Sequence, residues 1–384
     1  MLLRDGTGLS AARVRAGAGS LLLCWLCLLA ALPWLAPNMA VGRDFAAFWT
    51  AARLALHGQA VASYGAPGQA AMAALFGSGM YPAFFYPPPA LLLWLPFAWL
   101  PFGVAAAMWI GVSGLGYGLA MRAMLGRGGL VLAAAFPGAI LCALFGQNAL
   151  FSTLLFAGFA MLLEQAPMRA GMLIGCLLYK PQLAVLVPLA LIAARRWRAL
   201  AGAALSAVAL GGMSVVIFGQ RSWRAFFAVL PAARAWNADG MPGFDRFASP
   251  YAAIRMLGGA PTMAWIVQGA GMALAAILLV WLVHRRPGGP AEAALLVTAT
   301  GFCVPFLGVY DLVIFAIAGA WLAAEAGRGR WLGYERAGLA ALYLAPLAIV
   351  AASARGIPLA PLFLILLAAL VLRRVVGRVV RRVV

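Results

Sequence analysis

Long, uninterrupted apolar runs are the feature of this sequence that most limits how it can fold. They recur along the chain, and most can cross roughly 30 Å of hydrocarbon as a helix of about 20 residues. Lipid offers no hydrogen bonds to a backbone, so a spanning segment must be a helix or a strand of a closed barrel. The runs are continuous, whereas barrel strands alternate apolar and polar residues. The sequence therefore predicts an all-α integral membrane protein.

Composition and charge agree with this fold class. Of the 384 residues, 65% are hydrophobic and only 10% are charged, too few to cover the surface of a soluble domain. The formal net charge of +19 does not indicate a nucleic-acid partner, because the basic residues are spread over the ends of the apolar runs rather than gathered in one stripe. Cys24 and Cys27 have the spacing of a metal or redox pair but no companion ligands. We expect no metal, no cofactor and no structural disulfide.

The apolar runs predict a single domain over residues 1–384, with about twelve membrane crossings. The runs lie at 21–35, 86–100, 103–121, 130–145, 149–163, 171–194, 200–218, 262–283, 291–308, 311–324, 338–353 and 358–372. Arg4, Arg13 and Arg15 precede the first run, which favours a retained signal anchor with a cytoplasmic N-terminus. An even number of crossings then places both termini in the cytoplasm.

The distribution of arginine supports this topology, with one conflict. Four basic clusters fall on the cytoplasmic side, at 195–198, 284–286, 328–336 and 373–382. Arg122, Arg127 and Arg169, however, fall in short outer loops, where positive charge is disfavoured. The runs around Pro137 and Pro181 are short or broken, so half helices and re-entrant segments are alternatives in that part of the chain.

Two larger hydrophilic loops, 37–85 and 219–260, lie on the outer side in this topology. The first contains an amphipathic stretch, 44–57, in which Asp44 is a natural N-cap and Gly58 a natural stop. Its apolar face comprises Phe45, Phe48, Trp49, Ala52 and Leu56. We expect this helix to lie flat in the membrane interface.

Only nine acidic residues occur, and two of them are placed where chemistry could use them. Asp44 follows the first span, and Asp311 lies at the junction of two apolar runs; ionisable groups at such depths are hypotheses for function. Asp44 also has a structural interpretation, because an N-cap contributes about 1 kcal/mol. The two roles are compatible, since a helix that fixes a carboxylate at the mouth of a cavity would orient a general base.

Two further polar positions interrupt the apolar runs. Lys180, the only lysine, precedes Pro181, which disfavours helix at the residue before it. A cation there needs an anion, either Asp311 as a structural partner or a bound phosphate, and we favour the phosphate. Gln147 and Asn148 form a second notch, which could bind sugar hydroxyls or join helices by hydrogen bonds.

Five segments together resemble glycosyltransferase family 87, the polyprenyl-phosphate-mannose type of α-mannosyltransferase. They are 44–64, 85–101 (FYPPPALLLWLPFAWLP), 145–151 (FGQNALF), 170–198 with its YKPQ and RRWR, and 309–312 (VYDL). The resemblance implies a GT-C-like bundle with an acidic residue after the first helix, here Asp44, as general base. It also implies a polyprenyl-phosphate sugar as donor. The mannosyltransferases of this type have a histidine where this chain has Tyr310 and Asp311.

On this resemblance the chain is a hexosyltransferase that moves a mannose-like hexose to a lipid or glycan acceptor with inversion. The residues expected to bind the donor phosphate or sugar are Lys180, Arg43, Arg53, Tyr86, Gln147, Asn148 and Gln182, with Tyr310 and Asp311 as secondary candidates. We expect the lipid bilayer and no nucleic acid as partners, the bacterial inner membrane as location, and an active site facing the periplasm.

A secondary transporter or a flippase is the alternative function. About twelve crossings with buried charges would suit a transporter, but such folds usually contain repeated halves and paired broken helices. The two halves of this sequence differ, with their large loops in different places. Substrate uptake driven by a gradient would favour a transporter, and sugar release that depends on Asp44 would favour the enzyme.

Overall fold

The computed structural model describes residues 10–35, 41–76, 84–240 and 243–383, and every regular element within these ranges is a helix. The α-helices are α2 (Ala11–Leu35), α3 (Phe45–Leu56), α4 (Ala66–Phe76), α5 (Pro89–Trp94), α6 (Phe102–Leu125), α7 (Gly129–Ala135), α8 (Pro137–Phe145), α9 (Ala149–Leu162), α10 (Pro167–Gly175), α11 (Val187–Ala193), α12 (Trp197–Phe218), α13 (Gln220–Ala238), α14 (Pro250–Met256), α15 (Pro261–Val283), α16 (Gly289–Cys303), α17 (Ala316–Arg328), α18 (Glu335–Ser353) and α19 (Ala360–Val383). The 3-10 helices are η1 (Ala60–Ser63), η2 (Leu95–Phe97), η3 (Cys176–Tyr179), η4 (Pro181–Leu183), η5 (Phe244–Arg246) and η6 (Val309–Phe315).

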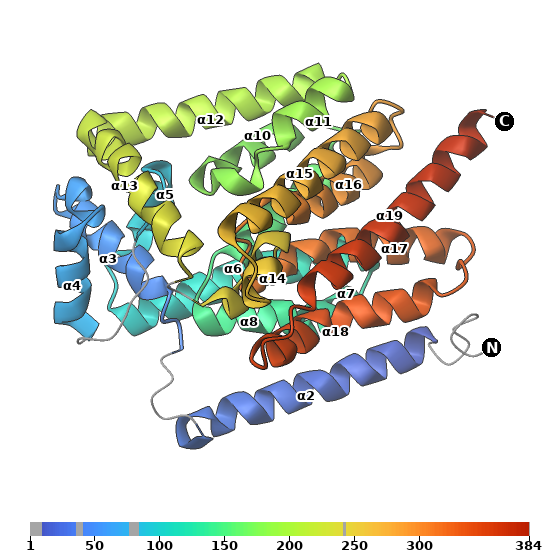
Figure 1. Ribbon diagram of the computed structural model, residues 1–384, viewed down its shortest axis with the longest axis horizontal. Helices are drawn as coiled ribbons and strands as arrows, with labels where there is room; N and C mark the ends of the chain where they lie inside the picture. Colours follow the sequence, from blue (N-terminus) through green and yellow to red (C-terminus); the bar gives the residue numbers. More distant parts are fainter. Residues whose placement is uncertain (1–9, 36–40, 77–83, 241–242, 384) are drawn as a thin grey trace.

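The all-α integral membrane class is confirmed. Within the described ranges, seven helices are long and apolar enough to cross a membrane, and shorter apolar helices accompany them. Figure 1 shows the long helices side by side in a bundle, with α2 along one edge and α12 along the opposite edge. The helices α3, α4, α5 and α13 gather on the left of this view. Arg4, and with it the start of the predicted signal anchor, lies outside the described residues.

One end of the bundle collects the basic clusters. Arg286 donates from Nε to the carbonyl oxygen of Ala194 at 3.1 Å, and Arg378 donates to the carbonyl oxygen of Pro287 at 3.1 Å and to Glu325 at 3.2 Å. These bonds join the α11–α12 and α15–α16 connections to α17 and α19. We call this the Arg-rich end; it comprises residues 164, 195–198, 284–292, 325–336 and 373–378.

The three arginines that conflicted with the predicted topology also lie toward this end. Arg127 follows α6 and lines one cavity together with Arg15 and Arg336, which belong to α2 and α18. Arg169 is in the first turn of α10, which packs beside the first turn of α12. Arg122 is in the last turn of α6. The bundle therefore gathers its positive charge at one end more strongly than the sequence-based topology suggested.

The apolar run 86–100 does not cross the bundle. It forms α5 and η2, and both of its ends contact α3. The ring of Tyr86 lies 5.1 Å from that of Phe48, and Trp49 donates from Nε1 to the carbonyl oxygen of Leu100 at 3.1 Å. Proline residues shorten the helices in this run, so it folds over α3 as a cap.

The run 171–194 is re-entrant, one of the alternatives left open by its proline. Glu164 precedes this segment and Arg196 follows it, and the two form an ion pair at 2.5 Å, so the chain leaves at the end where it entered. The break falls at Lys180. Gly171 lets α10 approach α12 closely, because a methyl group added there would lie 1.9 Å from the carbonyl oxygen of Ala199.

The first turns of α2 and the last turns of α19 lie on the same side of the bundle (Figure 1). The cytoplasmic location of both termini stays a prediction.

Helix α3 begins after Asp44 and ends before Gly58, whose φ of +76° suits glycine, as predicted. Its surroundings differ from the expectation. The apolar face packs against other helices, with the Phe48 ring stacked on Trp94 at 4.1 Å and the Phe45 ring on Trp109 at 6.4 Å. The helix is thus a buried element of the fold, and a position in the membrane interface stays a prediction.

Candidate active site

The backbone around Asp44 is fixed by the turn that joins α8 to α9. The amide nitrogen of Gly42 donates to the carbonyl oxygen of Leu144 at 2.8 Å, and that of Asp44 donates to Phe145 at 3.0 Å. Gly146 adopts a left-handed φ of +69°, and a side chain there would meet Gly42 Cα at 2.8 Å. Two segments a hundred residues apart in the chain, 42–44 and 144–146, therefore pack closely together and form one corner.

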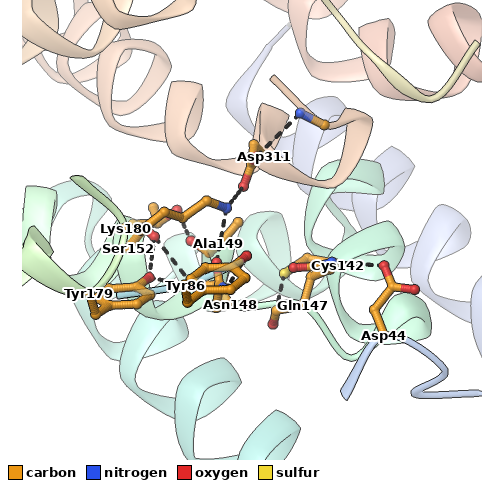
Figure 2. A network of polar contacts seen from close by, with 12 residues as sticks. Asp44, Tyr86, Cys142, Gln147, Asn148, Ala149, Ser152, Tyr179, Lys180 and Asp311 are labelled. Carbon is orange, nitrogen blue, oxygen red and sulfur yellow. Dashed lines mark hydrogen bonds and ion pairs between the residues drawn. The ribbon is translucent and has the colours of Figure 1, made fainter. Parts of the chain in front are cut away.

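The Asp44 carboxylate points into this corner rather than back onto its own helix. Its side chain makes no capping hydrogen bond to α3, so the N-cap interpretation is wrong for the side chain. Instead, Gln147 donates from Nε2 to Asp44 Oδ2 at 2.7 Å (Figure 2). The backbone oxygen of Gln147 accepts from Trp109 Nε1 and Cys142 Sγ, both at 3.4 Å, which holds this glutamine in place.

Burial raises the pKa of Asp44 above its ordinary value. The Gln147 hydrogen bond opposes this shift most, followed by the positive charges of Arg246 and Arg43. A partly buried carboxylate with a raised pKa, still accessible from one side, accepts protons better than an exposed one. Asp44 therefore has the environment that a general base requires.

The neighbouring residue, Asn148, belongs to a second polar network. Lys180 donates from Nζ to Asn148 Oδ1 at 2.9 Å and pairs with Asp311 Oδ1 at 2.6 Å, and the side chains of this ion pair are only 3% and 4% exposed. Asp311 Oδ2 also accepts from the amide of Gly308 at 3.3 Å. The structural alternative for Lys180, an ion pair with Asp311, is the one that the fold contains. Contact between Lys180 and a phosphate stays a prediction.

Two tyrosines complete this network. Asn148 donates from Nδ2 to the hydroxyl of Tyr86 at 2.8 Å. The Tyr179 hydroxyl lies 2.5 Å from Ser152 Oγ and donates to the backbone oxygen of Asn148 at 3.2 Å. Figure 2 shows these groups in one row, with Asp44 at one side and Lys180 at the other. The adjacent amides Gln147 and Asn148 thus connect the carboxylate to the buried ion pair.

The remaining sequence-predicted residues lie at different distances from this row. Tyr310 is next to it, with its ring centre 5.7 Å from Lys180 Nζ. Arg43 is partly buried and acts on the Asp44 charge. Arg53 instead lies over the Trp49 ring at 4.8 Å, and Gln182 is exposed. The structure therefore brings together most of the predicted set and leaves these two outside it.

Arg246, whose positive charge lowers the pKa of Asp44, was not among the residues predicted from the sequence. It lies in η5 of the second hydrophilic loop, and the next residues attach that loop to the chain before Asp311. Phe247 forms a bridge with Gly308, and the amide of Ala248 donates to the carbonyl oxygen of Leu307 at 2.7 Å. No local pattern marks Arg246, because its position depends on a contact between segments sixty residues apart.

Replacing Gln147 by leucine should shift the pH dependence of the sugar transfer that the resemblance implies. A general base must be ionised to accept a proton, so with Asp44 in that role kcat/KM falls as the pH drops through the Asp44 pKa. The Gln147 hydrogen bond lowers that pKa, and its loss raises it further, so the acidic limb should move to higher pH. Gln220→Leu, at an exposed position, is the control and should keep the wild-type limb. An unchanged limb in Gln147→Leu would show that Asp44 does not govern it.

Comparisons with known proteins identify the family. The chain matches no curated protein and no solved structure. Residues 84–307, more than half of its length, match glycosyltransferase family 87. Gln147, Asn148 and Lys180 lie within the matched segment, whereas Asp44 and Asp311 lie on either side of it. The protein is therefore a membrane glycosyltransferase, and the chain belongs to glycosyltransferase family 87.

Proposed function

We propose that this protein transfers a mannose-like hexose from a polyprenyl-phosphate sugar to a lipid or glycan acceptor, with inversion, and that Asp44 is its general base. The observation that carries this proposal is the Asp44–Gln147 pair. Burial raises the pKa of the Asp44 carboxyl, and the 2.7 Å hydrogen bond from Gln147 sets the direction of its side chain.

The chemistry requires one proton acceptor and a positive charge. As the acceptor hydroxyl attacks the anomeric carbon, the bond from that carbon to the phosphate oxygen breaks, and the phosphate leaves with the electron pair. Asp44 takes the hydroxyl proton. The positive charges of Arg43 and Arg246 both lower the pKa of Asp44, so both lie close enough to the base to offset the negative charge of the leaving phosphate.

Arg43 and Arg246 suit this role better than Lys180 does. The Lys180 charge is already balanced by Asp311 at 2.6 Å, and both side chains are buried. A phosphate that bound there would have to displace a carboxylate from a low-dielectric site. We therefore place the phosphate on the arginine side of Asp44 and treat Lys180 as a residue that positions Asn148.

The charge distribution supports the proposal that the active site faces the periplasm from the bacterial inner membrane. The Arg-rich end gathers the clusters that the positive-inside tendency assigns to the cytoplasm. The loop that carries Arg246, and Asp44 at the start of α3, lie away from those clusters (Figure 1). A donor activated by a lipid phosphate suits that compartment, because it reaches the enzyme through the membrane.

The donor class can be tested directly with purified protein in proteoliposomes. We expect hexose transfer to a lipid-extract acceptor from a polyprenyl-phosphate hexose and none from the corresponding nucleotide sugar, measured by mass spectrometry of the products. Asp44→Asn protein, prepared in the same way, is the control for contaminating activity. Transfer from the nucleotide sugar alone would overturn the proposed donor, and equal transfer by the control would overturn the proposed base.

A further inference from the structure

A long apolar groove runs between α2 and the rest of the bundle, apart from the Asp44 site. Its volume is about 930 Å³, within the range of sites that hold a ligand of substantial size. Its walls come from α6, α7, α17, α18 and α19, and Figure 1 shows α2 lying along the outside of these helices. Representative lining residues are Leu21, Leu132, Phe315, Leu339 and Leu364.

The groove has a charged rim at one end only. Arg13 and Arg15 of α2, Arg127 and Arg336 line it there, and no aspartate or glutamate lines it within the described part of the chain. Arg15 and Arg127 are both exposed. The rim therefore attracts a negatively charged group, and it lies at the Arg-rich end of the bundle.

The length of the groove fits a hydrocarbon chain. Its lining extends along α18 from Arg336 to Ile349, which is about 20 Å at 1.5 Å per residue. Half of a bilayer core is about 15 Å thick, so an acyl chain whose headgroup lies at the rim would reach past the middle of the membrane. The polar atom of Tyr343 on this wall is already satisfied by the carbonyl oxygen of Leu132 at 2.8 Å.

We propose that this groove binds an anionic phospholipid, with its phosphate at Arg15 and Arg127 and one acyl chain between α2 and α18. Basic pockets between membrane helices on the cytoplasmic side suit anionic headgroups, and each arginine adds attraction. A polyprenyl phosphate bound in the same direction would place its phosphate at the end of the groove remote from Leu312, the lining residue next to Asp311. The groove is therefore assigned to a lipid that is not the sugar donor.

The first test compares lipids on the full-length protein after delipidation in detergent. Native mass spectrometry should show phosphatidylglycerol retained more strongly than phosphatidylethanolamine with the same acyl chains. In the double variant Arg15→Gln/Arg127→Gln, phosphatidylglycerol should bind roughly 30-fold more weakly, since each lost charge costs about fivefold. Arg355→Gln removes an exposed arginine outside the groove and should bind as wild type does.

A second variant tests the apolar part without changing charge. Gly319 lines the groove, and a Cβ atom added there would meet no atom within 4 Å, so the phenylalanine of Gly319→Phe has room to start from the backbone and should fill the groove. It should abolish phosphatidylglycerol retention, whereas Gly269→Phe, at an exposed position of α15 outside the groove, should not. Equal retention of the two lipids by wild type, unchanged binding in both groove variants, or displacement of phosphatidylglycerol by an equal concentration of polyprenyl phosphate would overturn the proposal.

Discussion

Asp44→Asn should reduce sugar transfer by a factor of about 10² to 10⁴, the contribution expected of a positioned general base. The asparagine keeps the size of the side chain and can still meet Gln147, but it cannot accept the proton. Binding of the donor should change little, because the base acts when the acceptor hydroxyl attacks. We therefore expect the loss in kcat rather than in KM, measured by initial rates of product formation in proteoliposomes.

The matched control for this experiment is Asp239→Asn. Asp239 is an exposed carboxylate of the second hydrophilic loop, and its replacement removes the same charge without touching the corner that holds Asp44. Both variants should be equally abundant in the membrane and elute alike from a sizing column. Wild-type kcat in Asp44→Asn would show that the carboxylate is structural, and the base would then have to be sought at Asp311.

Lys180→Met should destabilise the fold by about 3–5 kcal/mol, because it leaves the Asp311 carboxylate buried without its partner. Asp311→Leu should cost a similar amount for the converse reason. The double variant Lys180→Met/Asp311→Leu should recover much of this loss, since it removes both charges and leaves no buried ion. Thermal unfolding in detergent, monitored as the loss of monodisperse protein, measures the stability of all three variants.

The same double variant separates the two roles considered for Lys180. If the lysine only positions Asn148 and balances Asp311, the folded double variant should retain measurable transfer with a donor KM close to that of wild type. If the lysine binds the donor phosphate, the donor KM of the double variant should rise sharply even though its stability recovers. Stability of the double variant no better than that of Lys180→Met alone would contradict the ion-pair argument itself.

The sequence was informative where a property depends on neighbouring residues. Apolar run length predicts the membrane helices, and Asp44, Gly58 and the apolar positions between them predict α3 with its ends. The notch at Gln147 and Asn148 and the break at Lys180 stand out because polar residues are rare in such runs. Those positions became the row of side chains in Figure 2.

What the sequence did not determine depends on contacts between distant segments. The re-entrant path through Lys180 requires the Glu164–Arg196 ion pair and the close packing of Gly171 on α12, whereas a 24-residue apolar run reads equally well as one crossing. The direction of the Asp44 side chain depends on Gln147, a hundred residues away. The same holds for Arg246, whose loop is attached near Gly308.

The corner formed by Gly42 and Gly146 makes two short motifs, residues 42–44 and 145–147, dependent on one another. Both glycines have left-handed φ angles, of +77° and +69°, and their backbones lie too close for a side chain at position 146. A substitution of either glycine would strain the turn that orients Asp44 toward Gln147. The two motifs should therefore be transplanted or redesigned as a pair, because a chimera that takes one from each of two relatives would inherit a carboxylate and an amide that no longer meet.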